Sequence, residues 1–375
     1  MKPVVAHYNS SYLPITEVWL YNQLKQLEGF STPFLCRTTQ NLNMFPMDQV
    51  FALNDLTSIS KIFNLLYFKA FGYIPSFASR IKEAKLLHVH FGYNAIKMAG
   101  LKRHLKIPMI CSFYGIDAFS YPFLKPGNGR RLNRMFHQVD KVLVLGPYMR
   151  DSLVELGCPS SKIAIHHLGV DLSRIKYQKR VYDPSRPIRF LMASSFLEKK
   201  GVDICLKALS NLKNKIDFSV DVVGDGPLKI RIIEILEEGG IRDRVTLHGY
   251  KPYDYFISLA YQSDVFLQAS KTSRSNDKEG TPMSLVDAMA TGLPVVATRH
   301  SDIPEIVQHG TTGFLSEENS ISEFEKAIMK MADSITDISS FSEKSRKWVE
   351  EQFNVRKQSD RLSSIYSELM KTPNI

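Results

Sequence analysis

The chain has 375 residues, more than one ordinary hydrophobic core organises, so two domains of about 150–200 residues each are expected. Its hydrophobic share of 44% and charged share of 23% are typical of a globular protein, and no apolar run reaches the roughly 20 residues that span a bilayer. The net charge of +10 is carried by residues 1–175, which hold 20 basic and 10 acidic side chains. This asymmetry suggests an anionic partner for the N-terminal half, with extra solubilising lysines as the alternative.

The first residues, "MKPVVAHYNSSYLP", lack the apolar core of a signal peptide, so a cytoplasmic location is expected. The four cysteines are scattered, with no C-x-x-C pairing: Cys36, Cys111, Cys158 and Cys205. This spacing favours reduced thiols that serve as small core residues, and it argues against a disulfide framework or a zinc site.

Short apolar runs that end in Gly, Pro or polar residues predict the strands. In chain order they are "PVVAHY", "LLHVHF", "PMICSFYG" and "KVLVLG" in the N-terminal half, then "IRFLMASS", "FSVDVVGDG", "RVTLHGY", "DVFLQAS" and "PVVAT". Amphipathic stretches such as "VDICLKALSNLKNK" and "LKIRIIEILEEGG" lie between them and predict helices. Continuous apolar strands separated by helices indicate parallel sheets covered on both faces. The predicted fold is therefore α/β, with two doubly wound, Rossmann-like domains that face each other across a cleft.

The predicted domains are residues 1–175 and 187–350, joined through the polar, basic segment Asp171–Pro187. A long helical tail follows and is expected to break near Asn354. Ligands of open α/β sheets bind outside the carboxyl ends of the strands, so functional residues are expected in the loops that follow them.

The stretch "EGTPMSLVDAMATG" (residues 279–292) predicts a helix that Thr281 caps, that Pro282 opens and that Gly292 ends. A helix N-terminus at a strand end binds anions, because its amides and dipole favour negative charge. A nucleotide sugar fits this geometry, with its diphosphate at the amides, its sugar near Glu279 and its ribose near Asp287. The alternative for Asp287 is an ion-paired residue on an exposed helix face.

Two further patterns follow strands in the C-terminal half. In "SSFLEKKGVD" a lysine, Lys199 or Lys200, could reach a diphosphate, although a lysine pair before a helix is more often solvated surface. The stretch "VVGDGPLK" lacks the third glycine of a dinucleotide-binding fingerprint, so it gives little support to an NAD site.

In the N-terminal half, "HVHFG" (88–92) and "SFYGID" (112–117) end two predicted strands. His88 and His90 could bind a metal, but no carboxylate or cysteine motif joins them, and a core histidine is the alternative. No D-x-D pair is present. A metal-independent reaction is therefore favoured, with Lys200 and helix amides meeting the phosphate charge.

Taken together and in order, these motifs resemble the retaining glycosyltransferases of family four, which have the GT-B fold. The resemblance covers most of residues 85–320 and is most specific at "EGTPMSLVDAMATGLPVVATRHSDIPEIVQHGTTGFL". The opening "PITEVWLYNQLKQL" also looks like the branch that builds bacterial exopolysaccharides such as colanic acid.

The resemblance implies that Glu279 contacts the donor sugar, Lys200 the diphosphate and Asp287 the ribose. The donor site it implies comprises Ser195, Lys200, Gly224, Gly249, Tyr250, Glu279, Gly280, Thr281, Pro282, Met283, Ser284, Leu285 and Asp287. It also implies catalytic roles for four residues: Glu279, Lys200, Asp117 and Tyr114. The acceptor contacts that it implies are at Glu17, His90 and Tyr114.

Three positions depart from the family pattern. Asp287 stands where a glutamate is usual, Ser195 where an arginine is usual, and Tyr114 where a histidine is usual. The family also implies that the final helix, within residues 351–375, crosses back onto the N-terminal domain.

The expected activity is transfer of a sugar from a UDP- or GDP-linked donor to a glycan or lipid-linked acceptor, with retention of anomeric configuration and no metal cofactor. The implied pathway is bacterial cell-surface polysaccharide or lipopolysaccharide synthesis. The basic stretches 97–106 and 124–136 are candidates for contact with an anionic membrane on its cytoplasmic face, or are ordinary solvated helices.

Three other classes stay open at this point. An epimerase or a phosphorylase could share the fold, and a non-catalytic scaffold of a polysaccharide assembly complex would explain Ser195 and Tyr114. A nucleic-acid binder has no recognised motif in its support.

Overall fold

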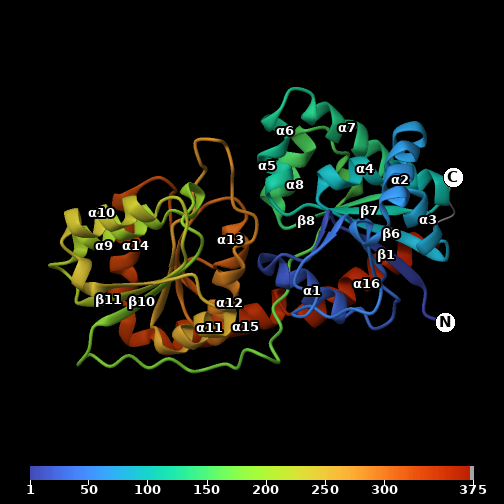
Figure 1. The fold of residues 1–375 in the computed structure, drawn as a ribbon. Coiled ribbons are helices and arrows are strands. Elements are labelled where there is room, and N and C mark those ends of the chain that lie inside the picture. Colours follow the sequence, from blue (N-terminus) through green and yellow to red (C-terminus); the bar gives the residue numbers. More distant parts are fainter. Residues whose placement is uncertain (372–375) are drawn as a thin grey trace. The chain divides into compact units, whose positions relative to one another are not determined.

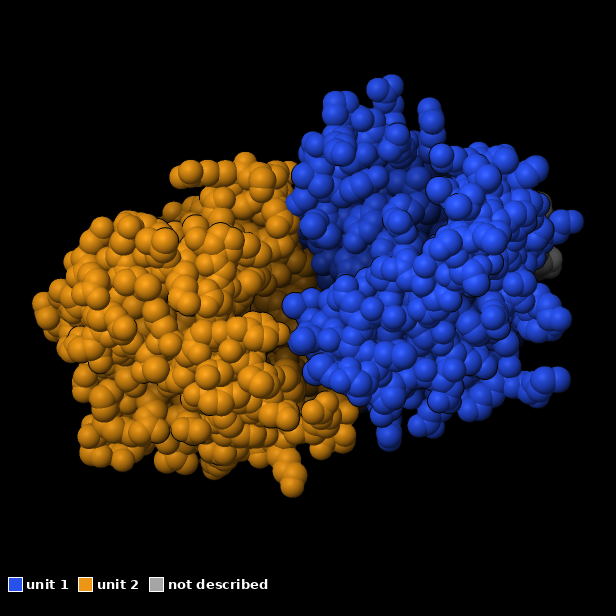
Figure 2. Space-filling model, viewed as in Figure 1, with its two compact units in different colours: residues 1–169, 355–375 blue, residues 170–354 orange. Residues whose placement is uncertain are grey.

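The computed structural model describes residues 1–371 and divides into two compact units. Unit 1 comprises Met1–Gly169 together with the chain from Val355 onward, and unit 2 comprises Val170–Asn354 (Figure 2). The last four residues of the expected C-terminal segment 351–375 lie outside the described part of the chain.

The segment Asp171–Pro187, expected to be a linker, belongs to unit 2. Arg180 explains why: its side chain is buried and its guanidinium donates to the carbonyl of Tyr261 and to the hydroxyl of Thr291. The polar, basic segment is therefore not a linker, because hydrogen bonds fix it to the rest of unit 2.

Unit 1 contains a seven-stranded parallel sheet with the order β5-β3-β1-β6-β7-β8-β9. Its strands are β1 (Val4–Tyr8), β3 (Phe34–Cys36), β5 (Val50–Ala52), β6 (Ala84–His90), β7 (Met109–Ser112), β8 (Lys141–Val144) and β9 (Ile163–Ile165). The central strands are buried on both faces, as the continuous apolar runs predict. Two short strands, β2 (Ser11–Tyr12) and β4 (Thr38–Thr39), pair separately.

Helices cover both faces of this sheet (Figure 1). They are α1 (Val18–Lys25), α2 (Ser58–Phe71), α3 (Pro75–Arg80), α4 (Gly92–Leu105), α5 (Ile116–Phe119), α6 (Tyr121–Leu124), α7 (Asn128–Gln138), α8 (Pro147–Glu155) and α16 (Val355–Lys371). Helix α16 packs against α1 and β6, where Tyr366 is fully buried.

Unit 2 contains a six-stranded parallel sheet with the order β12-β11-β10-β13-β14-β15. Its strands are β10 (Ile188–Ala193), β11 (Phe218–Val223), β12 (Val245–Gly249), β13 (Val265–Gln268), β14 (Val295–Thr298) and β15 (Gly313–Ser316). Its helices are α9 (Val202–Leu212), α10 (Lys229–Gly239), α11 (Tyr253–Gln262), α12 (Met283–Thr291), α13 (Ile303–Ile306), α14 (Ile321–Asp333) and α15 (Ile338–Gln352). Separate apolar clusters fill its two faces, one under α9, α10 and α14 and one under α11, α12 and α15.

The strand orders confirm the predicted α/β fold with two doubly wound domains and fix where ligands can bind. The order reverses between β1 and β6 in unit 1 and between β10 and β13 in unit 2. Loops that leave the carboxyl ends of such neighbouring strands diverge to opposite faces and leave a crevice between them. Each unit therefore has one topological switch point, and the loops after these four strands are the first place to look for a site.

The predicted break in the C-terminal tail is also confirmed, because α15 ends at Gln352 and α16 begins at Val355. All four cysteines are buried free thiols, as expected. Within residues 1–371, none of the helices combines the length and the apolar character needed to cross a bilayer.

Candidate functional site

At the switch point of unit 2, the loops after β10 and β13 bring two opposite charges together. Lys200 ends the short 3₁₀ turn η4 (Glu198–Lys200), and Glu279 lies in the loop that leads to α12. The Nζ atom of Lys200 is 2.5 Å from Oε2 of Glu279, and both side chains are largely buried. The two residues are 79 positions apart in the chain, so only the fold makes this pair.

The charge state of Glu279 follows from two opposing effects. Burial raises the pKa of the Glu279 carboxyl, and the positive charges of Lys200 and Lys199 lower it. The lysines outweigh the burial, so the pKa of Glu279 lies below its ordinary value and the residue is a carboxylate at neutral pH. Lys199 is itself held by Asp277, at 2.9 Å. A buried ion pair of this kind is weak evidence for stability but fits a site that handles charge.

A histidine and a second glutamate fix the backbone of Glu279. The backbone N–H of Glu279 donates to Nε2 of His300 at 3.0 Å, so the proton of the imidazole resides on Nδ1. That Nδ1–H donates to the carboxylate of Glu318 at 2.5 Å. Burial lowers the pKa of His300 and favours this neutral form. His300 and Glu318 are therefore positioning residues for Glu279.

Gly201 sets the position of Lys200 by letting η4 approach the end of β13. Its φ of +63° is left-handed, and a Cβ atom there would overlap the carbonyl oxygen of Ala269. Only glycine satisfies both conditions. The tight contact between the two strand-end loops is what holds Lys200 beside Glu279.

Replacing Gly201 with alanine is expected to destabilise the protein by about 3 kcal/mol or more, because left-handed strain and a backbone clash add together. Gly310→Ala is the matched control: its φ is +75°, but nothing lies within 4 Å of an added Cβ atom. We expect it to cost only the roughly 1–2 kcal/mol of left-handed strain. Denaturant unfolding of both variants measures the difference; equal losses would contradict the close approach.

The helix after Glu279 starts one residue later than predicted. The assignment of Thr281 as N-cap and Pro282 as first helical residue was wrong: Pro282 is the N-cap, because its ψ of 96° is not helical, and α12 begins at Met283. Gly292 ends the helix in a left-handed conformation, as predicted. The amides of Met283 and Ser284 open the first turn, where no carbonyl of the same helix can accept from them.

Asp287 is buried within α12 and does not lie on an exposed helix face. The hydroxyl of Tyr253, from α11, donates to its Oδ1 at 3.0 Å. Burial raises the pKa of Asp287 to about 7, although the hydrogen bond from Tyr253 lowers it. Arg174 lies 6.0 Å from the centre of the Tyr253 ring. A carboxyl held in this way can change its charge when a polar ligand binds.

The remaining residues of the expected donor site lie at strand ends of the same sheet. Ser195 follows β10 and is exposed, and Tyr250 follows β12 with 66% of its surface exposed. Gly224 follows β11 with a φ of +146°, and a Cβ atom there would overlap the carbonyl oxygen of Ser194. The backbone N–H of Gly224 donates to the carbonyl of Gly249 at 2.9 Å. The others precede or open α12: Gly280, Thr281, Pro282, Met283, Ser284 and Leu285.

In unit 1, Asp117 holds two segments of backbone together, and the catalytic role expected for it stays a prediction. Its carboxylate is fully buried and accepts from the backbone N–H groups of Tyr114, Gly115 and Gly92. These bonds join the loop after β7 to the start of α4. Burial raises the pKa of Asp117 to about 6. Asp117 is thus a positioning residue for the two loops.

Polar and aromatic side chains gather at the switch point of unit 1. The side-chain amide of Asn9, just after β1, donates to Glu17 at 2.9 Å, and the amide of Asn94 donates to Asn9 at 3.1 Å. Burial raises the pKa of Glu17 to about 7. The rings of Trp19 and Tyr114 lie 4.4 Å apart and are only partly buried. A partly exposed carboxyl beside aromatic rings suits a sugar, which offers hydroxyls and apolar ring faces.

His90 contacts Tyr114 of this group and is fully buried, and the acceptor contact expected for it stays a prediction. Its Nδ1 pairs with the hydroxyl of Tyr114 at 2.7 Å and its Nε2 with Nδ1 of His7 at 3.1 Å. His88 pairs with Tyr366 and Ser112. Burial lowers the pKa of all three histidines, so they are neutral.

The three histidine side chains also lie close enough together to supply three nitrogen ligands to one metal ion. In the structure five of their six ring nitrogens are engaged with one another and with hydroxyl groups of Tyr114, Tyr366 and Ser112, whereas Nε2 of His7 has no hydrogen-bond partner among the described residues. The three histidines and their hydroxyl partners therefore form a polar core that connects α16 to Tyr114.

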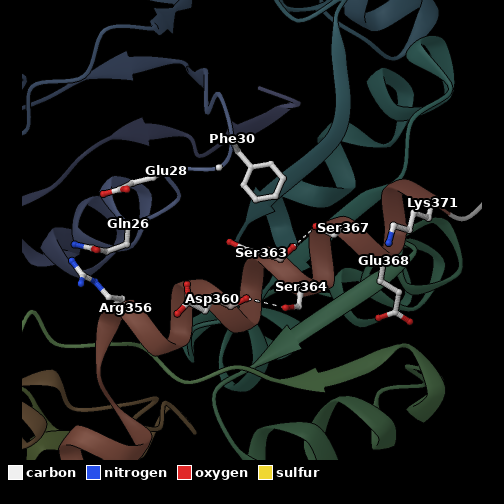
Figure 3. Close-up of a pocket in the computed structure, with 11 residues that line it drawn as sticks. Gln26, Glu28, Phe30, Arg356, Asp360, Ser363, Ser364, Ser367, Glu368 and Lys371 are labelled. Atoms are coloured by element: carbon white, nitrogen blue, oxygen red, sulfur yellow. Dashed lines mark hydrogen bonds between the residues drawn. The ribbon is translucent and has the colours of Figure 1, made fainter. Parts of the chain in front are cut away.

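A separate pocket of about 1200 Å³ lies in unit 1 between α16 and the chain that follows α1 (Figure 3). Phe30 lies on one side, and Ser363, Ser367 and Glu368 of α16 lie on the other. The serine hydroxyls donate to carbonyls one turn earlier in their own helix. None of the expected site residues lines this pocket, so it is not part of the candidate site.

Sequence reasoning missed three side chains that complete the unit 2 site: Tyr253, His300 and Glu318. Each contacts its partner across 18 to 34 positions, through neighbouring strands and helices. His300 carried a usable signal, because it lies two residues after the strand "PVVAT". Tyr253 lies in α11, and no sequence pattern indicated its contact with Asp287.

Comparison with known proteins gives two matching family models. "Glycosyltransferase Family 4" matches residues 46–174, and "Glycosyl transferases group 1" matches residues 173–352. AmsK of Erwinia amylovora, an amylovoran biosynthesis glycosyltransferase, is 30% identical over 276 residues, which cover 72% of this chain and 67% of AmsK. WcaL of Escherichia coli K12, named as a colanic acid biosynthesis glycosyltransferase, is 30% identical over 291 residues, covering 76% and 71%.

Solved structures agree on the fold. Anabaena Alr3699/HepE, crystallised in complex with UDP, superposes with a TM-score of 0.78 at 17% identity, covering 98% of this chain and all of that one. The lipopolysaccharide outer core galactosyltransferase WaaB superposes with a TM-score of 0.74 at 14% identity, covering 97% and 99%. These similarities establish the two-domain GT-B architecture. Together with the family models and the two relatives, they show that the chain is a glycosyltransferase and belongs to glycosyltransferase family 4.

Proposed function

We propose that this chain is a retaining glycosyltransferase that moves a sugar from a UDP- or GDP-linked donor to a glycan or lipid-linked glycan in cell-surface polysaccharide synthesis. The observation that carries the proposal is the buried Lys200–Glu279 pair at the switch point of unit 2. AmsK and WcaL, named for two exopolysaccharides, support the pathway. HepE, crystallised with UDP, supports the donor class.

In this proposal Lys200 and the first amides of α12 receive the donor diphosphate, and Glu279 accepts hydrogen bonds from the sugar hydroxyls. Negative charge grows on the leaving phosphate during transfer, and a buried cation stabilises that charge more than it stabilises the ground state. The diphosphate would thus be bound by the positive charge of Lys200 and by helix amides, a combination that needs no metal ion. The acceptor hydroxyl attacks from the face that the phosphate leaves, and a phosphate oxygen takes its proton.

Asp287 is the proposed ribose anchor. Its carboxylate accepts hydrogen bonds from ribose hydroxyls, and the hydroxyl of Tyr253 already holds Oδ1 in place. The aspartate is one methylene shorter than the glutamate usual in the family, so the nucleotide sits correspondingly closer to α12. Asp287→Glu should therefore weaken nucleotide binding if the shorter side chain is matched to this site.

The acceptor is proposed to bind at the switch point of unit 1, where Glu17 and the rings of Trp19 and Tyr114 are accessible. The excess positive charge of residues 1–175 suits a lipid-diphosphate carrier or an anionic bilayer. The enzyme would then work as a peripheral protein on the cytoplasmic face of the membrane.

Incubation with a panel of UDP- and GDP-sugars, with and without lipid-linked acceptor, tests the function. We expect acceptor-dependent release of one nucleoside diphosphate, a product with the donor's anomeric configuration by NMR, and full activity in EDTA. An inverted product would refute the retaining assignment, and loss of activity in EDTA would refute metal independence. Donor conversion without any acceptor would instead point to an epimerase.

The pKa of Asp287 gives a pH prediction. With its pKa near 7, Asp287 is mostly protonated below about pH 6 and ionised above about pH 8. Ribose hydroxyls donate to the ionised form, so affinity for a nucleotide sugar is expected to rise about tenfold across this range.

Titration calorimetry with UDP-glucose and GDP-mannose measures this dependence, because their diphosphates do not titrate there. Asp287→Asn should bind with little dependence on pH. A wild-type affinity that falls as the pH rises would contradict the role of Asp287.

A further inference from the structure

Helix α2 presents its apolar side chains to solvent. Six large apolar residues of this helix are at least half exposed, from 54% for Phe63 to 82% for Ile59. Ile59, Ile62, Phe63 and Leu66 follow the spacing i, i+3, i+4, i+7, which places them in one stripe along the helix. Such a stripe normally faces a protein core, and here it faces outward.

The inward side of α2 is fixed by a polar contact. Asn64 is the buried residue of the helix, and its amide donates to the hydroxyl of Ser76 at 2.8 Å and to the carbonyl of Ser60. Its carbonyl oxygen accepts from the backbone N–H of Ser76 at 3.0 Å. Rotating α2 to bury its apolar stripe would break these hydrogen bonds of the buried Asn64, so the outward stripe is a property of the fold.

The C-terminal end of α2 rests against the basic end of α4, at the periphery of unit 1 (Figure 1). Gly100 of α4 touches the backbone of Gly72, and the rings of Tyr73 and His104 stack at 4.0 Å. Between Leu56 and Ile116 the sequence has nine lysines and arginines but a single acidic residue, Glu83. The part of the chain that carries the exposed stripe is thus strongly basic.

We propose that α2 is a membrane-docking helix, which lies in the plane of an anionic bilayer with the stripe among the acyl chains and Lys61 and Lys69 at the headgroups. Its 14 residues extend about 21 Å, too short to span the roughly 30 Å hydrocarbon layer but suited to lying within its surface. The inference deepens the proposed function, since it names the element that would bring the enzyme to a lipid-linked acceptor.

A second copy of the chain is the other occupant to consider. An α2–α2 contact under two-fold symmetry would set Lys61 and Lys69 of one helix against the same residues of the other, with no acidic side chain in α2 to offset them. An anionic bilayer matches this charge instead. The helices first expected to meet the membrane are less suited, because the apolar residues of α7 (Leu132, Met135 and Phe136) and Met98 and Leu101 of α4 are buried in unit 1.

Sedimentation with vesicles of phosphatidylglycerol and phosphatidylcholine tests the proposal. The wild type should bind anionic vesicles at low salt and bind them less at high salt. The double variant Ile62→Glu/Leu66→Glu should lose about 100-fold or more in partitioning, because two inserted side chains become charged. Ile230→Glu, at a position of unit 2 that is 73% exposed, is the matched control and should bind like the wild type.

Two results would overturn the proposal. One is failure in the vesicle assay, either because the wild type does not bind or because the double variant binds as well as the wild type. The other is a lipid-free dimer, seen by analytical ultracentrifugation, that the double variant converts to monomer, because the stripe would then be an interface between copies. The double variant should bind UDP and GDP as tightly as the wild type does. These titrations test only the proposed donor site, so membrane docking through α2 and donor binding can be refuted independently.

Discussion

Glu279→Ala is expected to lower sugar transfer by about 100- to 1000-fold, the loss typical when one preorganised polar group of an active site is removed. The carboxylate is held by Lys200 on its side chain and by His300 on its backbone, so its position is set before the donor arrives. The variant also leaves the largely buried Lys200 without its partner, which destabilises the site. Steady-state kinetics, with thermal unfolding as a check on folding, measure both effects.

Glu317→Ala is the matched control for this substitution. Glu317 is a neighbouring carboxylate whose side chain is 70% exposed and lies 3.5 Å from Arg299. An exposed ion pair of this kind contributes little, so transfer and stability should stay near wild type. Turnover that Glu279→Ala leaves intact would move the reacting centre away from the switch point of unit 2.

Lys200→Met is expected to lower kcat by about 100-fold, with a smaller effect on KM. The positive charge acts mainly on the leaving diphosphate, so its loss is felt more in the transition state than in the bound donor. Methionine keeps the length and much of the volume of the side chain. Without the nearby cation the pKa of Glu279 should also rise, because burial would no longer be opposed by Lys200.

Lys199→Met separates the role of Lys200 from a general loss of positive charge. Lys199 is adjacent in sequence and similarly buried, but it pairs with Asp277. We expect the control to retain most of the activity. Equal losses in the two variants would show that summed charge, and not the specific Lys200 contact, supports the diphosphate.

The fold was largely predictable because its central strands are continuous apolar runs. All nine predicted strands form, and the strands that were missed are short or lie away from the sheet centres: β2, β3, β4, β5, β9 and β15. A three-residue strand such as Phe34–Cys36 carries too little pattern to be distinguished from a loop. Its place in the sheet is set by pairing with β1 and β5.

The site was predictable where function depends on strand ends, and not where it depends on contacts between helices. Lys200 and Glu279 lie in the loops that follow β10 and β13, and parallel topology brings these loops together. Asp287 was noticed as a carboxylate in an apolar helix, but its partner Tyr253 comes from a different helix. Asp117 and His90 were expected at the reacting centre because of the family resemblance; both are fully buried, and their direct contacts with a substrate stay predictions.

The proposed function depends on unit 2 binding a nucleoside diphosphate through Lys200 and α12. Calorimetric titration of the wild type and of Lys200→Met with UDP, GDP, uridine and guanosine tests it most directly. We expect one diphosphate to bind at least about tenfold more tightly than its nucleoside, and Lys200→Met to remove most of this advantage. Diphosphates that bind no better than nucleosides, or an advantage that survives in Lys200→Met, would contradict it.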